Sequence, residues 1–201
     1  MAGAAAGRWI VIAGHFGLAA AVKSRARSLP LWTLMLACQW LDVVFVPLLL
    51  AGVERLEPIA GAAEGAYGQV IIHADYTHSL VGALVLSLVF GAVAALRYGR
   101  GAGGVLALVA FSHWVLDLVV HRADMPLLPG GGARLGFGLW RSPAAAGGVE
   151  LALVVLGAVL YGRAARVVAG TDAAQARRAT RCGAAVLVSG LLTLGLNLAG
   201  M

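Results

Sequence analysis

Six apolar stretches run along the chain, separated by short connections that carry most of its charged residues. A helix needs about 20 apolar residues to cross the ~30 Å hydrocarbon core of a bilayer. The pattern therefore predicts an all-α polytopic bundle of about six transmembrane spans, forming one integral membrane domain over residues 1–201. The expected spans are residues 7–22, 30–53, 78–96, 104–121, 144–168 and 182–199.

Basic residues are distributed unevenly among the connections. If Arg163 and Arg166 at the end of the fifth stretch are counted with the fifth connection, the first, third and fifth connections hold ten of the fifteen Lys and Arg residues, whereas the second and fourth hold four. Because cytoplasmic loops are enriched in Lys and Arg, we expect both termini and the second and fourth connections on the extracytoplasmic side. The basic cluster Lys23, Arg25 and Arg27 follows the first stretch, which favours a retained helix over a cleaved signal peptide.

The composition agrees with a membrane protein and excludes an ordinary soluble domain. Of its residues 61% are hydrophobic and 12% charged, and the mean hydropathy is +0.89. The net charge of +6 sits in short connections, so it indicates topology and not nucleic-acid binding. Cys38 and Cys182 are far apart in apolar stretches, so we expect two buried, inert thiols and no disulfide.

The fourth stretch contains the most unusual polar pattern. His113, Asp117 and His121 are spaced by four residues, so a continuous helix would place all three on one face. An ionisable group inside a membrane segment costs about 2.5–3.5 kcal/mol on insertion scales. Several ionisable groups on one helix face therefore need a common stabilising partner, and a bound divalent cation would be one.

Polar residues of other stretches fall at a similar depth in the expected topology. His15, His78 and Glu150 lie in the outer halves of their spans, and Asp42 lies near the midplane. Thr77 is expected to cap the third span. These positions predict one polar cup open to the extracytoplasmic side.

The residue types of this cup are metal ligands. Imidazole and carboxylate suit zinc best, with manganese or iron as alternatives. We expect His121 and Glu150 to act as further ligands or as general acid and base. Acid should release the metal, because imidazole must be neutral to bind it. The expected metal ligands are His15, Asp42, His78, His113 and Asp117, with His73 and Asp75 as additional ones.

The motifs that contain these residues resemble a family. They are Gly14-His15-Phe16, Asp42, Tyr76-Thr77-His78-Ser79 and Ser112-His113-Trp114-Val115-Leu116-Asp117. The set is similar to that of the bacterial proteins described as predicted membrane-bound metal-dependent hydrolases, which are related to the LexA-binding inner-membrane hydrolases. The Pro-Asp-x-Asp-His run of that family is replaced by Trp40-Leu41-Asp42-Val43-Val44. The resemblance implies a multi-pass protein of the bacterial cytoplasmic membrane.

The order of the ligands has a more distant likeness to the zinc-dependent phospholipase C and nuclease group. That likeness implies a phosphoesterase, with Arg122 and Arg141 binding the anionic substrate. Ser79 is a further residue expected to bind substrate. The leading hypothesis is a metal-dependent hydrolase of an ester or phosphoester, plausibly a lipid.

Two other functions fit the same residues. A metal-ion or proton-coupled transporter could use the His/Asp cluster, but Ser87, Ser189 and Thr193 are nearly the only polar groups of the inner half. A scaffold with a dry hydrogen-bond network is the third hypothesis. The expected partners are the lipid bilayer and a lipid or phosphoester substrate, with no nucleic acid.

Overall fold

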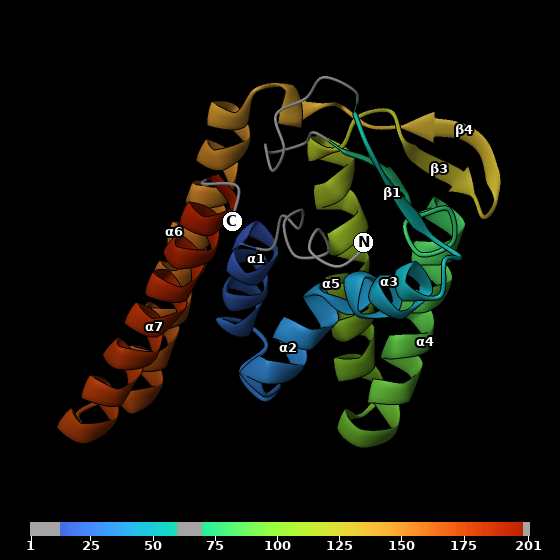
Figure 1. Cartoon of the computed structure of the whole chain (residues 1–201). Helices are drawn as coiled ribbons and strands as arrows, with labels where there is room; N and C mark the ends of the chain where they lie inside the picture. Colours follow the sequence, from blue (N-terminus) through green and yellow to red (C-terminus); the bar gives the residue numbers. More distant parts are fainter. Residues whose placement is uncertain (1–12, 60–69, 199–201) are drawn as a thin grey trace.

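The computed structural model describes residues 13–59 and 70–198, and this part of the chain is mostly helical (Figure 1). Two antiparallel two-stranded hairpins were not predicted. One pairs β1 with β2 and the other pairs β3 with β4. In chain order the elements are α1 Ala13–Lys23, α2 Leu31–Cys38, α3 Trp40–Leu50, β1 Arg55–Pro58, β2 Val70–His73, α4 Leu80–Tyr98, α5 Arg100–Val120, β3 Met125–Leu128, β4 Gly131–Leu135, the 3-10 turn η1 Leu139–Arg141, α6 Pro143–Ala169 and α7 Ala173–Leu198.

Three of the described helices are long and apolar enough to cross a membrane, namely α4, α5 and α6. The bent pair formed by α2 and α3 makes a fourth if it counts as one span. The predicted first span lies partly in residues 7–12, outside the described residues. Residues 182–198 of the predicted sixth span lie within α7, which begins nine residues earlier than expected, and residue 199 lies outside the described residues. Apolar helices of membrane length are confirmed, while the number of six spans stays a prediction.

The predicted second span, residues 30–53, is broken. Between α2 and α3 the axis bends by 51° at Gln39, whose backbone has φ −110° and ψ 8°. Neither Gly nor Pro occupies the break, although these residues cause most sharp kinks. The Cys38 carbonyl at the end of α2 accepts a hydrogen bond from the His113 ring, 2.7 Å away. The break therefore puts Asp42 in the first turn of a new helix, α3.

A tight turn at Gly99 joins α4 to α5, in place of the longer connection expected over residues 97–103. Gly99 has φ +86°, a conformation that favours glycine, and α5 begins at the next residue. The two helices then approach closely, because a Cβ at Gly103 would lie 2.5 Å from the Gly91 carbonyl oxygen. Small residues at a helix crossing allow this packing.

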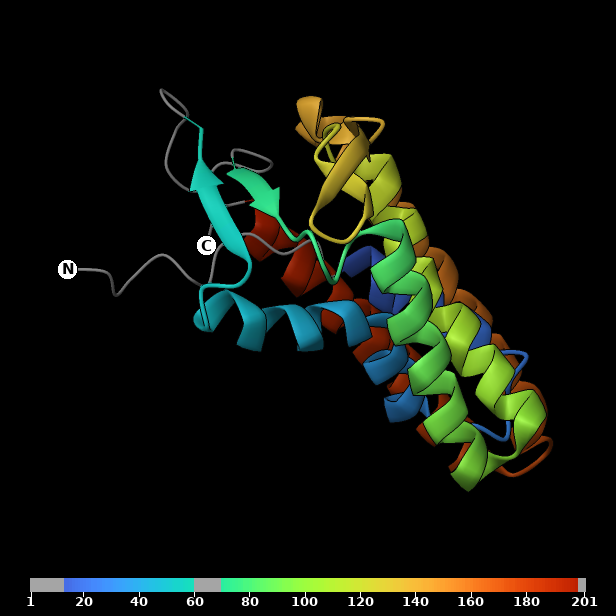
Figure 2. The ribbon, with the colours of Figure 1, turned by 90° about the vertical axis from the view of Figure 1, so that its right-hand side faces the viewer.

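The two ends of the bundle differ. Both hairpins lie at the upper end in Figures 1 and 2, and the α4–α5 and α6–α7 turns lie at the lower end. Near the upper part of the bundle α1 packs on α6 through Gly14 and Gly17. A Cβ on Gly14 would lie 3.3 Å from the Glu150 side chain, so α6 places Glu150 beside the residue that precedes His15.

Candidate metal centre

The five predicted ligands come together from four separate segments of the chain. His15 lies in α1, Asp42 in the first turn of α3, His78 two residues before α4, and His113 with Asp117 one turn apart on α5. The side chain of Asp42 is 18% exposed, whereas those of the other four are at most 7% exposed. The group is therefore buried, and Asp42 marks its most accessible side.

The donor atoms form two triangles that share one edge. His78 Nε2 and His113 Nε2, 3.3 Å apart, define this edge. Asp42 Oδ1 closes one triangle at 3.5 Å from His78 and 3.6 Å from His113. Asp117 Oδ2 closes the other at 3.5 Å and 3.1 Å from the same two nitrogens.

These spacings match the coordination shell of a small divalent cation. Donors about 2.0–2.1 Å from zinc in tetrahedral arrangement lie ~3.3–3.4 Å from one another. The buried His/Asp group can hold a metal ion, as the sequence predicts. Each triangle supplies three ligands, the number typical of catalytic zinc sites that keep a fourth position open.

The hydrogen-bond partners of His113 fix which of its nitrogens faces the centre. Its Nδ1 lies 2.7 Å from the Cys38 carbonyl oxygen. A carbonyl only accepts, so Nδ1 carries a proton, and the lone pair that a neutral ring offers to a metal is then the one on Nε2. The break after α2 is what frees this carbonyl, because a continuous helix would bond it within the helix.

His78 is oriented by a relay through Thr77 and Glu54. The Glu54 carboxylate is 1% exposed and accepts from the backbone N–H of Tyr76 at 3.0 Å and of Thr77 at 2.8 Å. It also accepts the hydrogen bond of the Thr77 hydroxyl, whose Oγ1 lies 2.9 Å from Glu54 Oε2. The Thr77 oxygen must then accept from His78 Nδ1–H, 2.8 Å away, which directs the Nε2 lone pair of His78 at the centre.

This arrangement concentrates electron pairs without a compensating cation. Two imidazole lone pairs and two carboxylates converge, and within the described ranges no Lys or Arg pairs with Asp42 or Asp117. Asp42 Oδ2 is buried with no hydrogen-bond partner among those residues. The unmatched oxygen and the donor types fit a divalent cation, and Asp/His sites of this kind suit zinc, manganese or iron.

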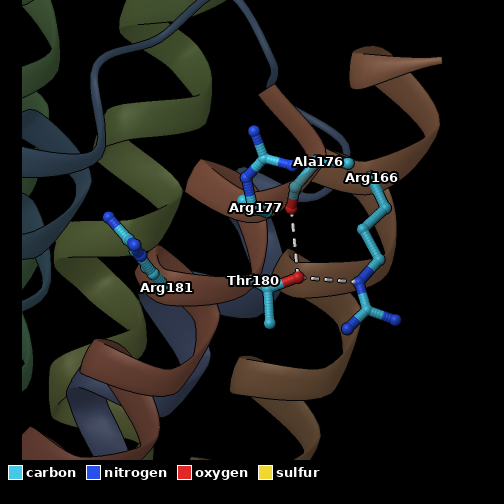
Figure 3. Close-up of a pocket in the computed structure, with 5 residues that line it drawn as sticks. All are labelled: Arg166, Ala176, Arg177, Thr180 and Arg181. Atoms are coloured by element: carbon cyan, nitrogen blue, oxygen red, sulfur yellow. Dashed lines mark hydrogen bonds between the residues drawn. The ribbon is translucent and has the colours of Figure 1, made fainter. Parts of the chain in front are cut away.

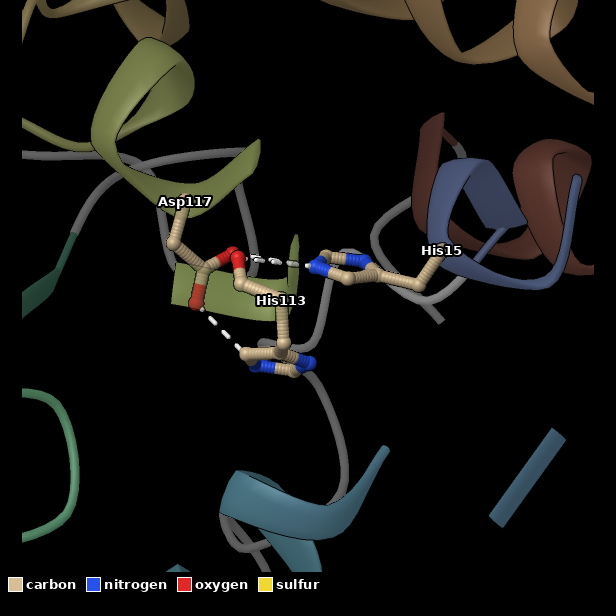
Figure 4. A group of neighbouring side chains, drawn as sticks. All are labelled: His15, His113 and Asp117. Atoms are coloured by element: carbon tan, nitrogen blue, oxygen red, sulfur yellow. Dashed lines mark hydrogen bonds and ion pairs between the residues drawn. The ribbon is translucent and has the colours of Figure 1, made fainter. Parts of the chain in front are cut away.

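His15 contacts the other oxygen of Asp117. Figure 4 shows the Asp117 carboxylate between His15 and His113, with His15 Nε2 3.4 Å from Oδ1. The two imidazole rings lie 4.1 Å apart between centroids. His15 Nδ1 is buried and has no partner among the described atoms. His15, His113 and Asp117 also form a group whose donor atoms could hold a metal ion, so the predicted role of His15 as a ligand stays a prediction.

The expected stripe of three residues on one helix face is wrong at its third member. Helix α5 ends at Val120, and His121 has an extended backbone, with φ −62° and ψ 151°. Its Nδ1 lies 3.1 Å from Asp124 Oδ1, and its ring lies 4.3 Å from that of Trp140. His121 therefore forms a separate buried pair at the β3–β4 end and does not join either triangle.

The predicted N-cap of the third span is also wrong. Ser79, and not Thr77, is the N-cap: its oxygen accepts from the Gly82 backbone N–H at 3.0 Å and donates to the Tyr76 carbonyl at 3.2 Å. Ser79 is fully buried. Its hydroxyl is committed to the helix start, so the structure does not support its expected contact with substrate.

The two additional ligands have partners in the hairpin region. His73 Nε2 lies 2.9 Å from Glu57 at an exposed site. Asp75 accepts from Arg134 at 3.0 Å. Both residues form these pairs, and neither belongs to a possible metal group among the residues that the structure describes.

The remaining predicted residues lie outside the possible metal groups found among the described residues. Glu150 is 2% exposed on α6. Arg122 follows the end of α5, and its Nε is buried. Arg141 is exposed at the end of η1, with its guanidinium near Gly138. Glu54 and Thr77 are the functional residues that the sequence reasoning missed, and only the position of Thr77 next to His78 could have indicated one of them.

Comparison of the chain with protein-family models, with curated proteins and with solved structures found no match.

Proposed function

We propose that this protein is a membrane-embedded hydrolase that binds a divalent cation, most suitably zinc, and acts on an ester or phosphoester, plausibly of a lipid. One observation carries the proposal. The ring tautomers set by the Cys38 carbonyl and by Thr77 turn two Nε2 lone pairs toward each other, 3.3 Å apart, between two carboxylates. A cation between them would take both nitrogens and the Asp42 carboxylate as ligands.

The proposed topology has six spans with both termini and the hairpins on the extracytoplasmic side of the bacterial cytoplasmic membrane. The placement of the basic residues supports it, since Arg97, Arg100 and the arginines of the α6–α7 turn lie at the end opposite the hairpins (Figure 1). His78 precedes α4, and Asp117 lies in the last turn of α5, so the centre faces the hairpin end.

The residues around the centre have separate proposed roles. A divalent cation would activate water and polarise the ester or phosphoester oxygen. His15 and Glu150, both buried beside the ligands, are the candidates for moving protons. Arg122 and Arg141 flank the hairpin end, where guanidinium groups can bind an anionic substrate.

Metal analysis with a matched pair of variants tests the binding. Purified wild-type protein should contain tightly bound zinc or manganese, and Asp42→Asn should lose it with little loss of folding, because Asp42 is the most exposed of the ligands. His121→Ala removes a histidine of similar burial outside both triangles and should keep the metal. Loss of metal in both variants, or no metal in the wild type, would overturn the proposal.

Activity is tested on chromogenic substrates in detergent micelles. A nitrophenyl ester and a nitrophenyl phosphodiester should be hydrolysed only by the metal-loaded protein, and added chelator should abolish turnover. A metal-loaded protein that hydrolyses neither, while its metal content follows the pattern above, would refute the hydrolase and leave the metal site standing.

The second candidate is a metal-ion or proton-coupled transporter. The 51° bend between α2 and α3 favours it, because interrupted membrane helices often line transport sites. Sealed liposomes that contain the protein should then take up zinc or protons, and Asp42→Asn should abolish this uptake. Uptake without turnover would reverse the ranking of the two functions.

A further inference from the structure

The end of α6 and the start of α7 concentrate positive charge that the metal centre does not use. Over residues 163–181 five arginines accompany a single carboxylate, that of Asp172. Asp172 caps α7: Oδ1 accepts from the backbone N–H of Ala174 at 2.8 Å and of Gln175 at 3.1 Å. Within residues 13–59 and 70–198 none of the five guanidinium groups pairs with a carboxylate. They belong to Arg163, Arg166, Arg177, Arg178 and Arg181.

A surface hollow of about 440 Å³ opens among three of these arginines. Its lining residues are Arg166, Ala176, Arg177, Thr180 and Arg181, and Figure 3 shows the three guanidinium groups on different sides of Thr180. Arg166 Nε donates to Thr180 Oγ1 at 3.2 Å, and Thr180 donates to the Ala176 carbonyl at 3.0 Å. The hydroxyl thus holds Arg166 by its Nε and leaves its terminal N–H groups for a ligand.

The hollow has a structural cause in the packing of the two helices. They approach closely at Gly162 and Gly183, where a Cβ on Gly183 would lie 3.3 Å from the Gly162 Cα. Arg166 lies one turn beyond this contact on α6, and Thr180 lies one turn before it on α7. The hollow therefore lies between this close contact and the turn that joins the two helices.

Three positive groups around one hollow favour the binding of an anion. Arg177 and Arg181 are four residues apart on one helix, a spacing at which like charges destabilise the helix. Arg166 adds a third positive charge from the facing helix. Phosphate is the anion that arginine binds best, through paired N–H groups on two oxygens.

The position along the helices indicates where this phosphate comes from. The apolar stretch of α6 ends at Tyr161, and that of α7 begins at Cys182. Arg166 lies five residues beyond Tyr161, about 7.5 Å along the helix axis, which is the depth of lipid headgroups next to a membrane span. We propose that this hollow binds the phosphate of an anionic lipid headgroup, with Arg166, Arg177 and Arg181 as its ligands.

Arg177 and Arg178 offer a matched pair for the test, because they are neighbours with equal charge and only Arg177 lines the hollow. The full chain, its Arg177→Gln variant and its Arg178→Gln variant are placed in phosphatidylcholine bilayers that contain a small fraction of phosphatidylglycerol. Native mass spectrometry then counts the phosphatidylglycerol retained by each protein. A second arm measures the melting temperature with added inorganic phosphate in phosphatidylcholine alone.

The wild type should retain phosphatidylglycerol over phosphatidylcholine, and Arg177→Gln should weaken retention about fivefold. Arg178→Gln should retain the lipid like the wild type. Stabilisation by inorganic phosphate that Arg177→Gln removes, without lipid selectivity, would overturn the lipid as the source. Equal losses in the two variants, or no selectivity in the wild type, would show a diffuse basic surface and overturn the site.

Discussion

Replacing Thr77 by Val should weaken metal binding although Thr77 is not itself a ligand. The substitution keeps the shape of the side chain and removes the hydroxyl that links Glu54 to His78 Nδ1. His78 then loses the bond that fixes its tautomer, so its Nε2 is no longer held as the free lone pair. Such partners of a metal-binding histidine are typically worth about 10–100-fold in metal affinity, or roughly 1.4–2.7 kcal/mol.

The same substitution should also lower the stability of the fold, and this effect must be separated from the loss of metal affinity. Both Glu54 and His78 are buried, and a buried polar group left without its partner costs about 1–3 kcal/mol. Thr33 is a matched control, because it is 4% exposed and its hydroxyl donates to the Pro30 carbonyl at 2.8 Å, away from the metal centre. Thr33→Val loses one buried hydrogen bond but no link to a ligand.

The assay is zinc affinity measured in competition with a chromophoric chelator, together with a melting curve of the metal-free protein. Thr77→Val should lose zinc affinity and stability, Thr33→Val stability alone, and Thr77→Ser should bind zinc like the wild type because its hydroxyl is restored. Equal zinc affinities for the two Val variants would refute the relay, as would a Ser variant that binds as weakly as the Val variant.

Three further predictions concern stability. A chelator should lower the melting temperature of the wild type but not that of Asp42→Asn, as scanning calorimetry checks, because a ligand that binds only the folded state stabilises it. Gly103→Leu should destabilise by about 1–3 kcal/mol in chemical denaturation, since its Cβ would contact the Gly91 carbonyl, whereas Gly104→Leu meets open space and should be tolerated. Hydrogen bonds from the backbone N–H groups of Gln175 and Ala174 lower the pKa of the Asp172 carboxyl below its ordinary value of 3.8. A lowered pKa stabilises the fold above pH ~3.9 and stops doing so as the pH falls further. The melting-temperature advantage of wild type over Asp172→Ala should therefore disappear in that range, and that of Asp172→Asn should persist.

The parts of the centre that could be predicted from sequence are those set by local geometry. His113 and Asp117 are one helical turn apart inside an apolar stretch, so helix periodicity alone places them together. The same periodicity fails for His121, because the helix ends one residue earlier and a turn redirects the side chain toward Asp124. Local spacing predicts a shared face only while the helix continues.

Long-range contacts account for what could not be predicted. Gln39 is not a residue type that predicts a helix break. The hydrogen bond to the freed Cys38 carbonyl comes from His113, 75 residues later in the chain. Glu54 lies in a connection with several other carboxylates, and only the return of the chain 23 residues later makes it the acceptor of Thr77. The hairpin strands are four or five residues long, too short for a clear alternating pattern.

The bond between the Cys38 carbonyl and the His113 ring joins the shape of the α2–α3 segment to the metal centre. A bend that holds His113 in its binding tautomer makes cation affinity and helix angle two readouts of one equilibrium, and their coupling is reciprocal. Any condition that favours a straighter α2–α3 segment must lower the affinity of the centre for a cation. A bound cation must in turn oppose the straightening by the same free energy. Bilayer thickness acts on helix tilt and length. The lipid environment would therefore change the affinity of this centre for a metal ion without contacting any ligand.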